Sequence, residues 1–310
     1  MGLETLECVP NVSEGRDRRV IEALAGAIRS VTGVCLADIH ADPDHHRSVF
    51  TFVGSPDAVE AAACALAEVA LGAIDITTHG GIHPRIGALD VLPFVPLRGV
   101  SMAEAVTIAH RVGRTLGTKF QVPVFFYAEA ALSPERRSLP AIRGGGYEGL
   151  AKRLADPAWR PDAGPARFNP RSGATVVGAR GVLVAFNVCL GSNDLDVARA
   201  IARAVRESSG GLPAVQAMGV PLARQGIVQV SLNLLDYRRT SLAQAFERVR
   251  VEAQRRGISI RRSELVGLAP RDAFEGATPE SLALPDFTDA KLLETHLPPH
   301  PPLSPSGGED

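Results

Sequence analysis

The sequence has almost no net charge, no apolar leader and no uncharged apolar run long enough for a membrane span. Its formal net charge is −1 over 310 residues, so it lacks the basic excess of a nucleic-acid-binding protein. The longest apolar helical stretch, residues 58–76, is interrupted by Glu60, Glu68 and Asp75. The first ten residues, MGLETLECVP, carry neither the basic nor the apolar segment of a secretion signal. We expect a cytoplasmic protein without nucleic-acid or membrane partners.

Cysteines are scarce, and none has a neighbour at metal-binding or redox spacing. The four lie far apart, each within an apolar run, at Cys8, Cys35, Cys64 and Cys189. Without a CxxC or zinc-finger pattern, such cysteines are typical of buried free thiols in a reducing compartment. We expect four buried free thiols and no disulfide.

What the sequence has instead is a pattern of short apolar strands and amphipathic helices that occurs twice. The first set comprises strand 5–10, a turn at 11–15, helix 20–31, strands 34–39 and 48–53, helix 56–76 and strand 88–95. Helix 101–116, opened by a capping box at Ser101, and strand 122–127 extend it. The second set comprises strand 182–190, helix 194–208, strands 214–220 and 227–235, helix 241–256 and strand 259–266.

Both sets have the order β-α-β-β-α-β, which is the ferredoxin-like order. We therefore expect an α+β fold of two ferredoxin-like subdomains with a ligand groove or tunnel between them. The N-terminal subdomain should span residues 1–178 and the C-terminal one residues 179–285. Residues 286–310, rich in Pro, Ser and Gly towards their end, are expected to form a disordered tail.

The stretch with the most chemistry is His79–Phe94, HGGIHPRIGALDVLPF. Three glycines let a ligand approach the backbone closely, and Pro84 biases His83 away from a helix. We expect His83 on a loop that enters a strand. A lone loop histidine is usually scaffolding, but a second polar cluster at residues 38–47 brings five of the eight histidines into residues 40–83. Clustered titratable groups indicate a site.

Two chemistries fit this cluster. Asp42, Asp44 and the histidines 45, 46, 79 and 83 are ordinary metal ligands, but Gly80, Gly81 and Pro84 oppose the helix that a His-x-x-x-His pair requires. The other reading is acid–base catalysis by one histidine, with arginines clamping carboxylates. The candidate arginines are Arg47, Arg85, Arg143 and Arg171.

Six strings resemble the glutamate formiminotransferase family, which is also the transferase half of formimidoyltransferase-cyclodeaminase. They are ECVPNVSEGRD, DPDHHRSVFTFVG, HGGIHPRIGALDVLPFVPLRGVSM, FFYAEAA, LPAIRGGGYEGL and GPARFNPRSGATVVGARGVLVAFNVCL, within residues 6–268. The chain ends about where the transferase domain would, so we expect no cyclodeaminase part.

The resemblance implies a metal-free homodimeric transferase that moves the formimino group of N-formimino-L-glutamate to N5 of tetrahydrofolate, in histidine degradation and one-carbon metabolism. It places the catalytic acid–base on His83. Residues implied in substrate and folate binding are Asn11, Asp38, His40, Arg47, Arg85, Gly164, Pro165, Ala166, Arg167, Phe168, Asn169, Pro170, Arg171, Ser172 and Gly173. The mammalian pattern has Asp-Val-Asp where this chain has Asp38-Ile39-His40, which puts the donor's identity in question.

Three alternatives stay open at this point. Transfer from or to a 5-formyl folate would use the same site, because both donors present a planar one-carbon unit. A metal-dependent hydrolase would release glutamate with water as the nucleophile. A non-catalytic folate-binding protein would bind without turnover.

Overall fold

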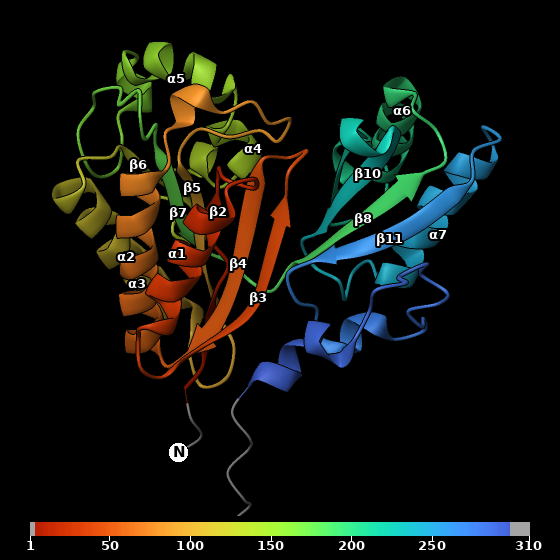
Figure 1. The fold of residues 1–310 in the computed structure, drawn as a ribbon, viewed down its shortest axis with the longest axis horizontal. Coiled ribbons are helices and arrows are strands. Elements are labelled where there is room, and N and C mark those ends of the chain that lie inside the picture. Colours follow the sequence, from red (N-terminus) through yellow and green to blue (C-terminus); the bar gives the residue numbers. More distant parts are fainter. Residues whose placement is uncertain (1–3, 298–310) are drawn as a thin grey trace, which may run out of the picture.

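The computed structural model describes residues 4–297, which form two α/β units side by side (Figure 1). The first unit contains β1 (Leu6–Cys8), β2 (Asn11–Val12), α1 (Arg18–Arg29), β3 (Val34–Asp42), β4 (Arg47–Gly54), α2 (Pro56–Ala73), β5 (Leu89–Pro96), α3 (Met102–Lys119), β6 (Val124–Ala128), α4 (Leu139–Ile142), α5 (Gly146–Leu154) and β7 (Thr175–Ala179). The second contains β8 (Val184–Leu190), α6 (Leu195–Val205), β9 (Val215–Leu222), β10 (Ile227–Leu234), α7 (Leu242–Gln254) and β11 (Ile260–Val266).

Local sequence signals account for where the helices begin. Ser101 and Glu104 form the predicted capping box of α3, each side chain bonding the other's backbone N–H. Ser55 caps α2, and Pro56 follows at the first helical position, where its missing N–H costs nothing. Helix α1 then buries Leu24, Ala25 and Ile28 on one face. These predicted helices are confirmed to within a few residues.

The first sheet has seven strands and both parallel and antiparallel pairs. Strands β1 and β2 each pair with β4 on one side and β5 on the other, so they act as one interrupted strand. Strand β3 pairs with β4 at one edge, while β7 and then β6 continue in parallel beyond β5. The edge strand β3 lies on the side of the second unit (Figure 1).

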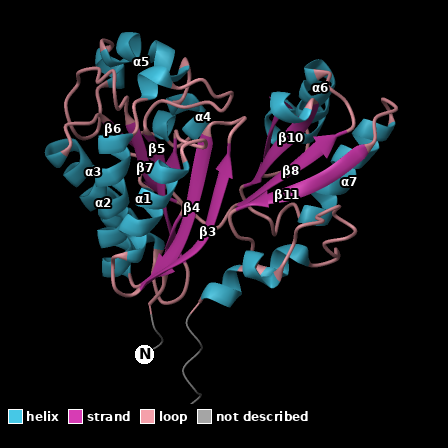
Figure 2. Cartoon of the chain, in the orientation of Figure 1, coloured by secondary structure: helices cyan, strands magenta, loops and turns pink. Residues whose placement is uncertain are grey.

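The second sheet has four antiparallel strands in the order β11-β8-β10-β9. Its apolar face, which includes Phe186, Val188, Val230 and Leu232, packs on α6 and α7. The other face carries polar side chains such as Asn187, Gln229 and Glu264 and is turned towards β3 (Figures 1 and 2). Two sheets thus meet with a polar surface between them.

The first sheet is covered on both faces. Helices α1, α2 and α3 bury one face against the largest core of the molecule. Part of the opposite face packs on α4, α5 and Trp159, and a smaller part on Leu268 and Leu293 from the chain beyond β11. The two units are therefore joined by apolar packing as well as by polar contacts.

Three expectations need correction. Strand β7 lies in ATVVGA, which the sequence analysis did not assign, because a five-residue apolar run without alternation gives no clear period. Cys35 is exposed because it lies on the edge strand β3, and Cys64 is only partly buried, whereas Cys8 and Cys189 are buried and all four are free.

The expected tail 286–310 is ordered in its first part. Residues 289–291 and 293–296 form two 3-10 turns, and Leu292 and Leu293 are buried against the rest of the chain. The remaining part of that expectation, residues 298–310, lies outside the described residues. Within residues 4–297, no helix is long and apolar enough to cross a membrane.

Candidate active site

The loop of residues 79–88 follows a short 3-10 turn at Ile76–Thr78 and enters β5, as predicted for His83. Gly87 forms an isolated bridge with Gly173, and a Cβ atom at Gly87 would collide with the backbone oxygen of Ala174. Glycine is therefore required there for the close backbone approach. The helix that a His79 and His83 metal pair would require is absent from this described loop.

His83 contacts an arginine from the neighbouring strand. The Nη1 atom of Arg47, the first residue of β4, lies 2.6 Å from Nε2 of His83 and 3.4 Å from Oδ1 of Asn11. A guanidinium only donates, so Nε2 of His83 accepts and the ring's proton lies on Nδ1. Burial lowers the pKa of His83 well below its ordinary value, and the charges of Arg47 and Arg143 lower it further. His83 is therefore a neutral base at pH 7.

A buried ion pair and a second imidazole complete this part of the cluster. Arg143 pairs with Asp90 on β5, whose other oxygen accepts a 2.8 Å hydrogen bond from the backbone N–H of Ile86. His45 is 2% exposed, stacks against His83 with ring centroids 5.9 Å apart, and has no hydrogen-bond partner on either ring nitrogen. Burial lowers the pKa of His45, so it too is uncharged at neutral pH.

Both ring nitrogens of His79 form hydrogen bonds with backbone groups. Its Nε2 donates to the backbone oxygen of His46 over 2.8 Å, and its Nδ1 accepts from the Gly81 N–H over 3.2 Å. Burial lowers the pKa of His79 to about 4. His46 stacks on it at 4.3 Å and contacts Glu14 at 3.2 Å. His79 therefore fixes the loop.

Arg85 lines the same hollow as Arg47 and His83 but has partners of its own. Its Nη2 lies 3.0 Å from Oε1 of Glu148 at the start of α5, and its guanidinium lies 5.8 Å from the ring centroid of Tyr147. The fourth candidate arginine, Arg171, donates to the backbone oxygen of Gly72. Of the four arginines, Arg47 and Arg143 are thus the ones whose charges act on His83 most strongly.

The segment 164–173 begins beside the C-terminal end of α3 and the residues that precede β6, and it ends at the His83 loop. Gly164 packs on Gly117, while Ser172 and Gly173 pair with the backbone at residues 86–88. The Tyr147 hydroxyl donates to the Pro170 carbonyl over 2.6 Å, and the Tyr147 and Phe168 rings lie 5.5 Å apart. The structure therefore brings the end of the segment close to the His83 loop.

Polar groups from the two units meet at the edge of β3. His40, Asp42 and Glu264 each offer one ligand atom, and these atoms lie within 4.8 Å of one another. Beside them, Lys291 Nζ lies 2.8 Å from Asp38 Oδ1. Among residues 4–297, this is the one His/carboxylate group with metal-site spacing. The cluster of histidines 45, 46, 79 and 83 is not part of it.

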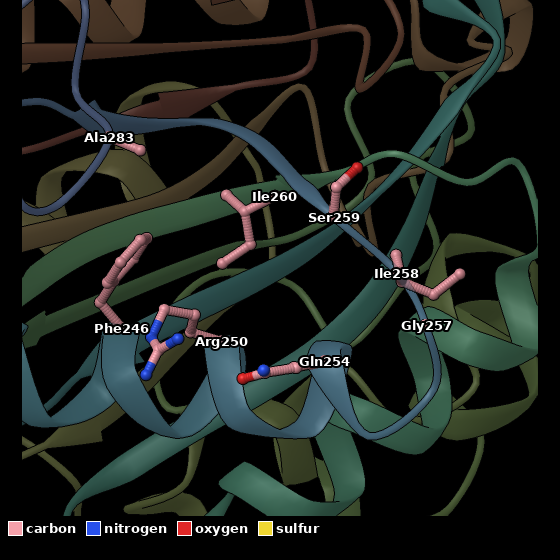
Figure 3. A pocket seen from close by; sticks show the side chains of 8 residues that line it. All are labelled: Phe246, Arg250, Gln254, Gly257, Ile258, Ser259, Ile260 and Ala283. Carbon is pink, nitrogen blue, oxygen red and sulfur yellow. The ribbon is translucent and has the colours of Figure 1, made fainter.

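The histidine cluster lines a narrow hollow that has no room for a water-sized molecule. A larger hollow of about 450 Å³ lies between α7 and β11, lined mainly by Phe246, Gln254 and Ile260 (Figure 3). It contains none of the candidate site residues.

Sequence reasoning did not select several residues that the fold brings to the site. Asp90 is the one charge in the apolar strand β5, and an isolated charge in a buried strand signals a partner across the fold. Glu264 gives no such signal, because its strand, IRRSELV, contains other charges. His45 was noted only as an alternative metal ligand, and its full burial cannot be inferred from the string DHHR.

The formiminotransferase domain family matches in two parts: its N-terminal subdomain over residues 5–180 and the formiminotransferase domain over residues 185–279. The chain is 41% identical over 293 residues to glutamate formimidoyltransferase of Streptococcus pyogenes, with 94% of this chain and 98% of that protein covered. It is also 41% identical over 298 residues to glutamate formimidoyltransferase of Thermoplasma acidophilum, covering 95% and 98%.

The mouse formimidoyltransferase-cyclodeaminase is 46% identical over 277 residues, which is 87% of this chain and 51% of the mouse protein. The chain thus spans about half the length of that bifunctional relative. Among solved structures, a microcompartment protein from Desulfitobacterium hafniense aligns with 13% identity and a TM-score of 0.22, too low to indicate a shared fold.

Proposed function

Because the chain belongs to the formiminotransferase family, we propose that it transfers the formimino group of N-formimino-L-glutamate to N5 of tetrahydrofolate. The products are 5-formimino-tetrahydrofolate and glutamate. The observation that carries the proposal is the neutral, buried His83, whose Nε2 is an acceptor facing Arg47. A transferase of this kind needs one group that can first accept and then donate a proton.

The proposed reaction moves one proton through His83. N5 of tetrahydrofolate attacks the formimino carbon, and His83 takes the proton that N5 loses as the new C–N bond forms. The tetrahedral intermediate then expels the glutamate nitrogen, and protonated His83 donates the proton to that nitrogen as the old C–N bond breaks. The histidine ends in its starting state, so no net proton is consumed.

The neighbouring residues supply binding. Arg47 and Arg143 are the cations whose charges most lower the pKa of His83, and we propose that a donor carboxylate replaces His83 as the partner of Arg47. This exchange would free Nε2 for the proton transfer. Asn11, which already accepts from Arg47, would hold the displaced guanidinium. Arg85 would meet substrate after leaving Glu148.

For the folate we propose the segment 164–173. The adjacent Tyr147 and Phe168 rings are partly exposed and offer apolar faces to an aromatic ligand. Asp38 and His40 would take part from the other side of the site, on β3. We propose tetrahydrofolate as co-substrate and no metal.

The division of the chain into two ferredoxin-like subdomains is part of the proposal. Support comes from the shared spatial strand order, β3-β4-β1-β5 in the first unit and β9-β10-β8-β11 in the second. The change of family match between residues 180 and 185 supports the proposed division into residues 1–178 and 179–285. We also propose a cytoplasmic homodimer, on the grounds of the family resemblance.

The proposal is tested by measuring glutamate release with and without tetrahydrofolate, each with and without a metal chelator. Formimino transfer predicts release that requires folate and is unaffected by chelator. Folate-independent release that chelator abolishes would instead identify a metal-dependent hydrolase. Folate binding without release of glutamate would identify a binding protein.

A further inference from the structure

His45 is a buried histidine that the fold leaves without a hydrogen-bond partner. Its side chain is 2% exposed, and neither ring nitrogen has a partner within residues 4–297. By contrast, His79, His110 and His296 each contact a backbone oxygen over 2.8 Å. A neutral imidazole has one donor and one acceptor nitrogen, and burying both without partners costs free energy. Packing alone therefore does not account for a histidine at this position.

The turn that carries His45 is held to both units of the protein. It joins β3 to β4, and the backbone N–H of His45 donates to Oδ1 of Asp42 over 2.8 Å. The backbone oxygen of Asp44 accepts the N–H of Ile82, next to His83, over 3.4 Å. The Oδ1 atom of Asp44 accepts the backbone N–H of Arg224, in the second unit, over 3.1 Å. The turn therefore fixes the backbone of His45 relative to the His83 loop.

The ring of His45 lies beside the ring of His83. The two ring centroids are 5.9 Å apart with their planes inclined by 23°, and both side chains line the narrow hollow together with Arg47 and Asp90. Burial, and after it the charge of Arg47, lowers the pKa of each imidazole. Two neutral imidazoles thus adjoin where the proton transfer is proposed. Of these two, His83 has a partner in Arg47, and His45 has none.

The proposed reaction has a task for a second neutral imidazole. When N5 attacks the amidinium carbon of the donor, the C=N electron pair moves onto the transferred nitrogen, and the carbon then carries three nitrogens. Protonated His83 must give its proton to the glutamate nitrogen, whose bond to carbon breaks. A proton given to the transferred nitrogen would instead release ammonia and leave the carbon joined to both folate and glutamate. Because the transferred nitrogen carries hydrogen at every stage, a neutral acceptor can hold it without protonating it.

We propose that His45 binds the formimino nitrogen of the donor, so that the two imidazoles divide the three nitrogens of the intermediate between them. His45 holds the transferred nitrogen, while His83 exchanges protons with N5 of the folate and with the glutamate nitrogen. The inference rests on the proposed function and adds a second histidine to its site. A ring nitrogen of His45 that has no partner in the fold gains one in the complex with the donor.

The test measures binding in H45F, which keeps an aromatic ring beside His83 but removes both ring nitrogens. The full-length parent and H45F are titrated calorimetrically with N-formimino-L-glutamate and with glutarate, which has the two carboxylates but no nitrogen. We expect the dissociation constant of the formimino compound to rise about 10-fold, the effect of one lost hydrogen bond, and that of glutarate to stay the same. The titration needs neither folate nor turnover, so its result is separate from the test of formimino transfer.

The melting temperature separates a binding role from a structural one. Because H45F removes two buried polar atoms that have no partner, its melting temperature should equal or exceed that of the parent. H110F is the matched control: His110 lies on α3, its Nε2 contacts the Ala130 oxygen, and it does not line the hollow. H110F should melt at a lower temperature and bind both compounds as the parent does. If H45F does not fold, H45L removes the same nitrogens with a smaller side chain, and the same results are expected of it.

Product analysis and two amide variants complete the test. During turnover by H45F, the ammonia released per glutamate should rise about 10-fold, because the transferred nitrogen is no longer held. H45N and H45Q each restore a donor and an acceptor, and the one whose amide reaches the position of the contacting ring nitrogen should recover affinity for the formimino compound. Equal weakening of the formimino compound and glutarate in H45F would identify a packing role and overturn the proposal. Unchanged binding of the formimino compound in H45F would overturn it as well.

Discussion

Arg47 donates a 2.6 Å hydrogen bond to Nε2 of His83, the nitrogen that the proposed mechanism uses for proton transfer. The contact favours the neutral imidazole, since protonation of Nε2 would place two cations against each other. It also occupies Nε2 of His83 until a ligand replaces His83 as the partner of Arg47. The same contact therefore sets both the protonation state and the accessibility of His83.

Replacing Arg47 with methionine should shift the acid limb of the pH profile of kcat/KM to higher pH by about one unit, because a nearby cation no longer opposes protonation of His83. The KM for the donor should also rise as a carboxylate partner is lost. R111M, which removes an exposed arginine paired with Glu60, is the control and should leave both unchanged. An R47M profile that overlays the parent's would show that Arg47 does not tune His83.

His83→Ala should lower kcat by about 10²- to 10⁴-fold with little change in the dissociation constant for tetrahydrofolate, because proton transfer is lost while the binding surface is kept. His79→Ala is the comparison. Its ring bonds only backbone groups of His46 and Gly81, so the main effect should be a lower melting temperature. Near-full turnover in H83A would refute the assignment of the acid–base.

Acidification should destabilise the fold through the buried histidines. The pKa of His79 is lowered to about 4 and that of His83 lies well below 6.5, so the unfolded chain binds protons that the native state does not. The contribution of these two histidines to the free energy of unfolding is complete above pH 6.5 and is lost as the pH falls towards 4. From pH 7.5 to 5.5, urea titration should show a loss of about 1 kcal/mol for each such histidine.

Glu7 has the opposite effect on stability: it stabilises the fold as the pH falls from 7 to 4.5. Burial raises its pKa to about 7, so its native state gains protons between pH 7 and 4.5 and is stabilised relative to the unfolded chain. E7Q removes that opposing contribution. The loss of unfolding free energy between pH 7.5 and 5.5 should therefore be larger in E7Q than in the parent, and an equal or smaller loss would contradict this assignment of signs.

Gly87→Ala should destabilise the protein and disrupt the His83 loop, because the added Cβ would collide with backbone atoms of Ala174. We expect a loss of at least about 2 kcal/mol in unfolding free energy. Gly26→Ala is the control: this glycine lies in α1 with open space around it, and alanine there should add about 0.5–1 kcal/mol. A stable and active G87A would show that the loop adapts without the bridge to Gly173.

Much of the fold could be predicted because each signal is local. The apolar period of α1 and the capping box of α3 are properties of a few consecutive residues, and the structure confirms both helices. The loop position of His83 followed from Pro84 in the same way. Strand β7 was missed because five buried residues in parallel pairing need no alternation.

The candidate site was less predictable because its contacts join distant segments. Arg47 and His83 were both selected from the sequence, but their hydrogen bond depends on how the 79–88 loop folds over β4. The approach of Glu264 to His40 depends on how two separate sheets dock. Burial of His45 on all sides is likewise a result of packing, not of its neighbours in the chain.

The most direct test of the central claim follows the one-carbon unit itself. The protein is incubated with tetrahydrofolate and N-formimino-L-glutamate labelled with ¹³C at the formimino carbon, and the products are identified by ¹³C NMR and mass spectrometry. Our account predicts that the label appears on N5 of the folate in step with unlabelled glutamate, and that H83A slows both together. Label released as formamide or formate while the folate stays unmodified would contradict it.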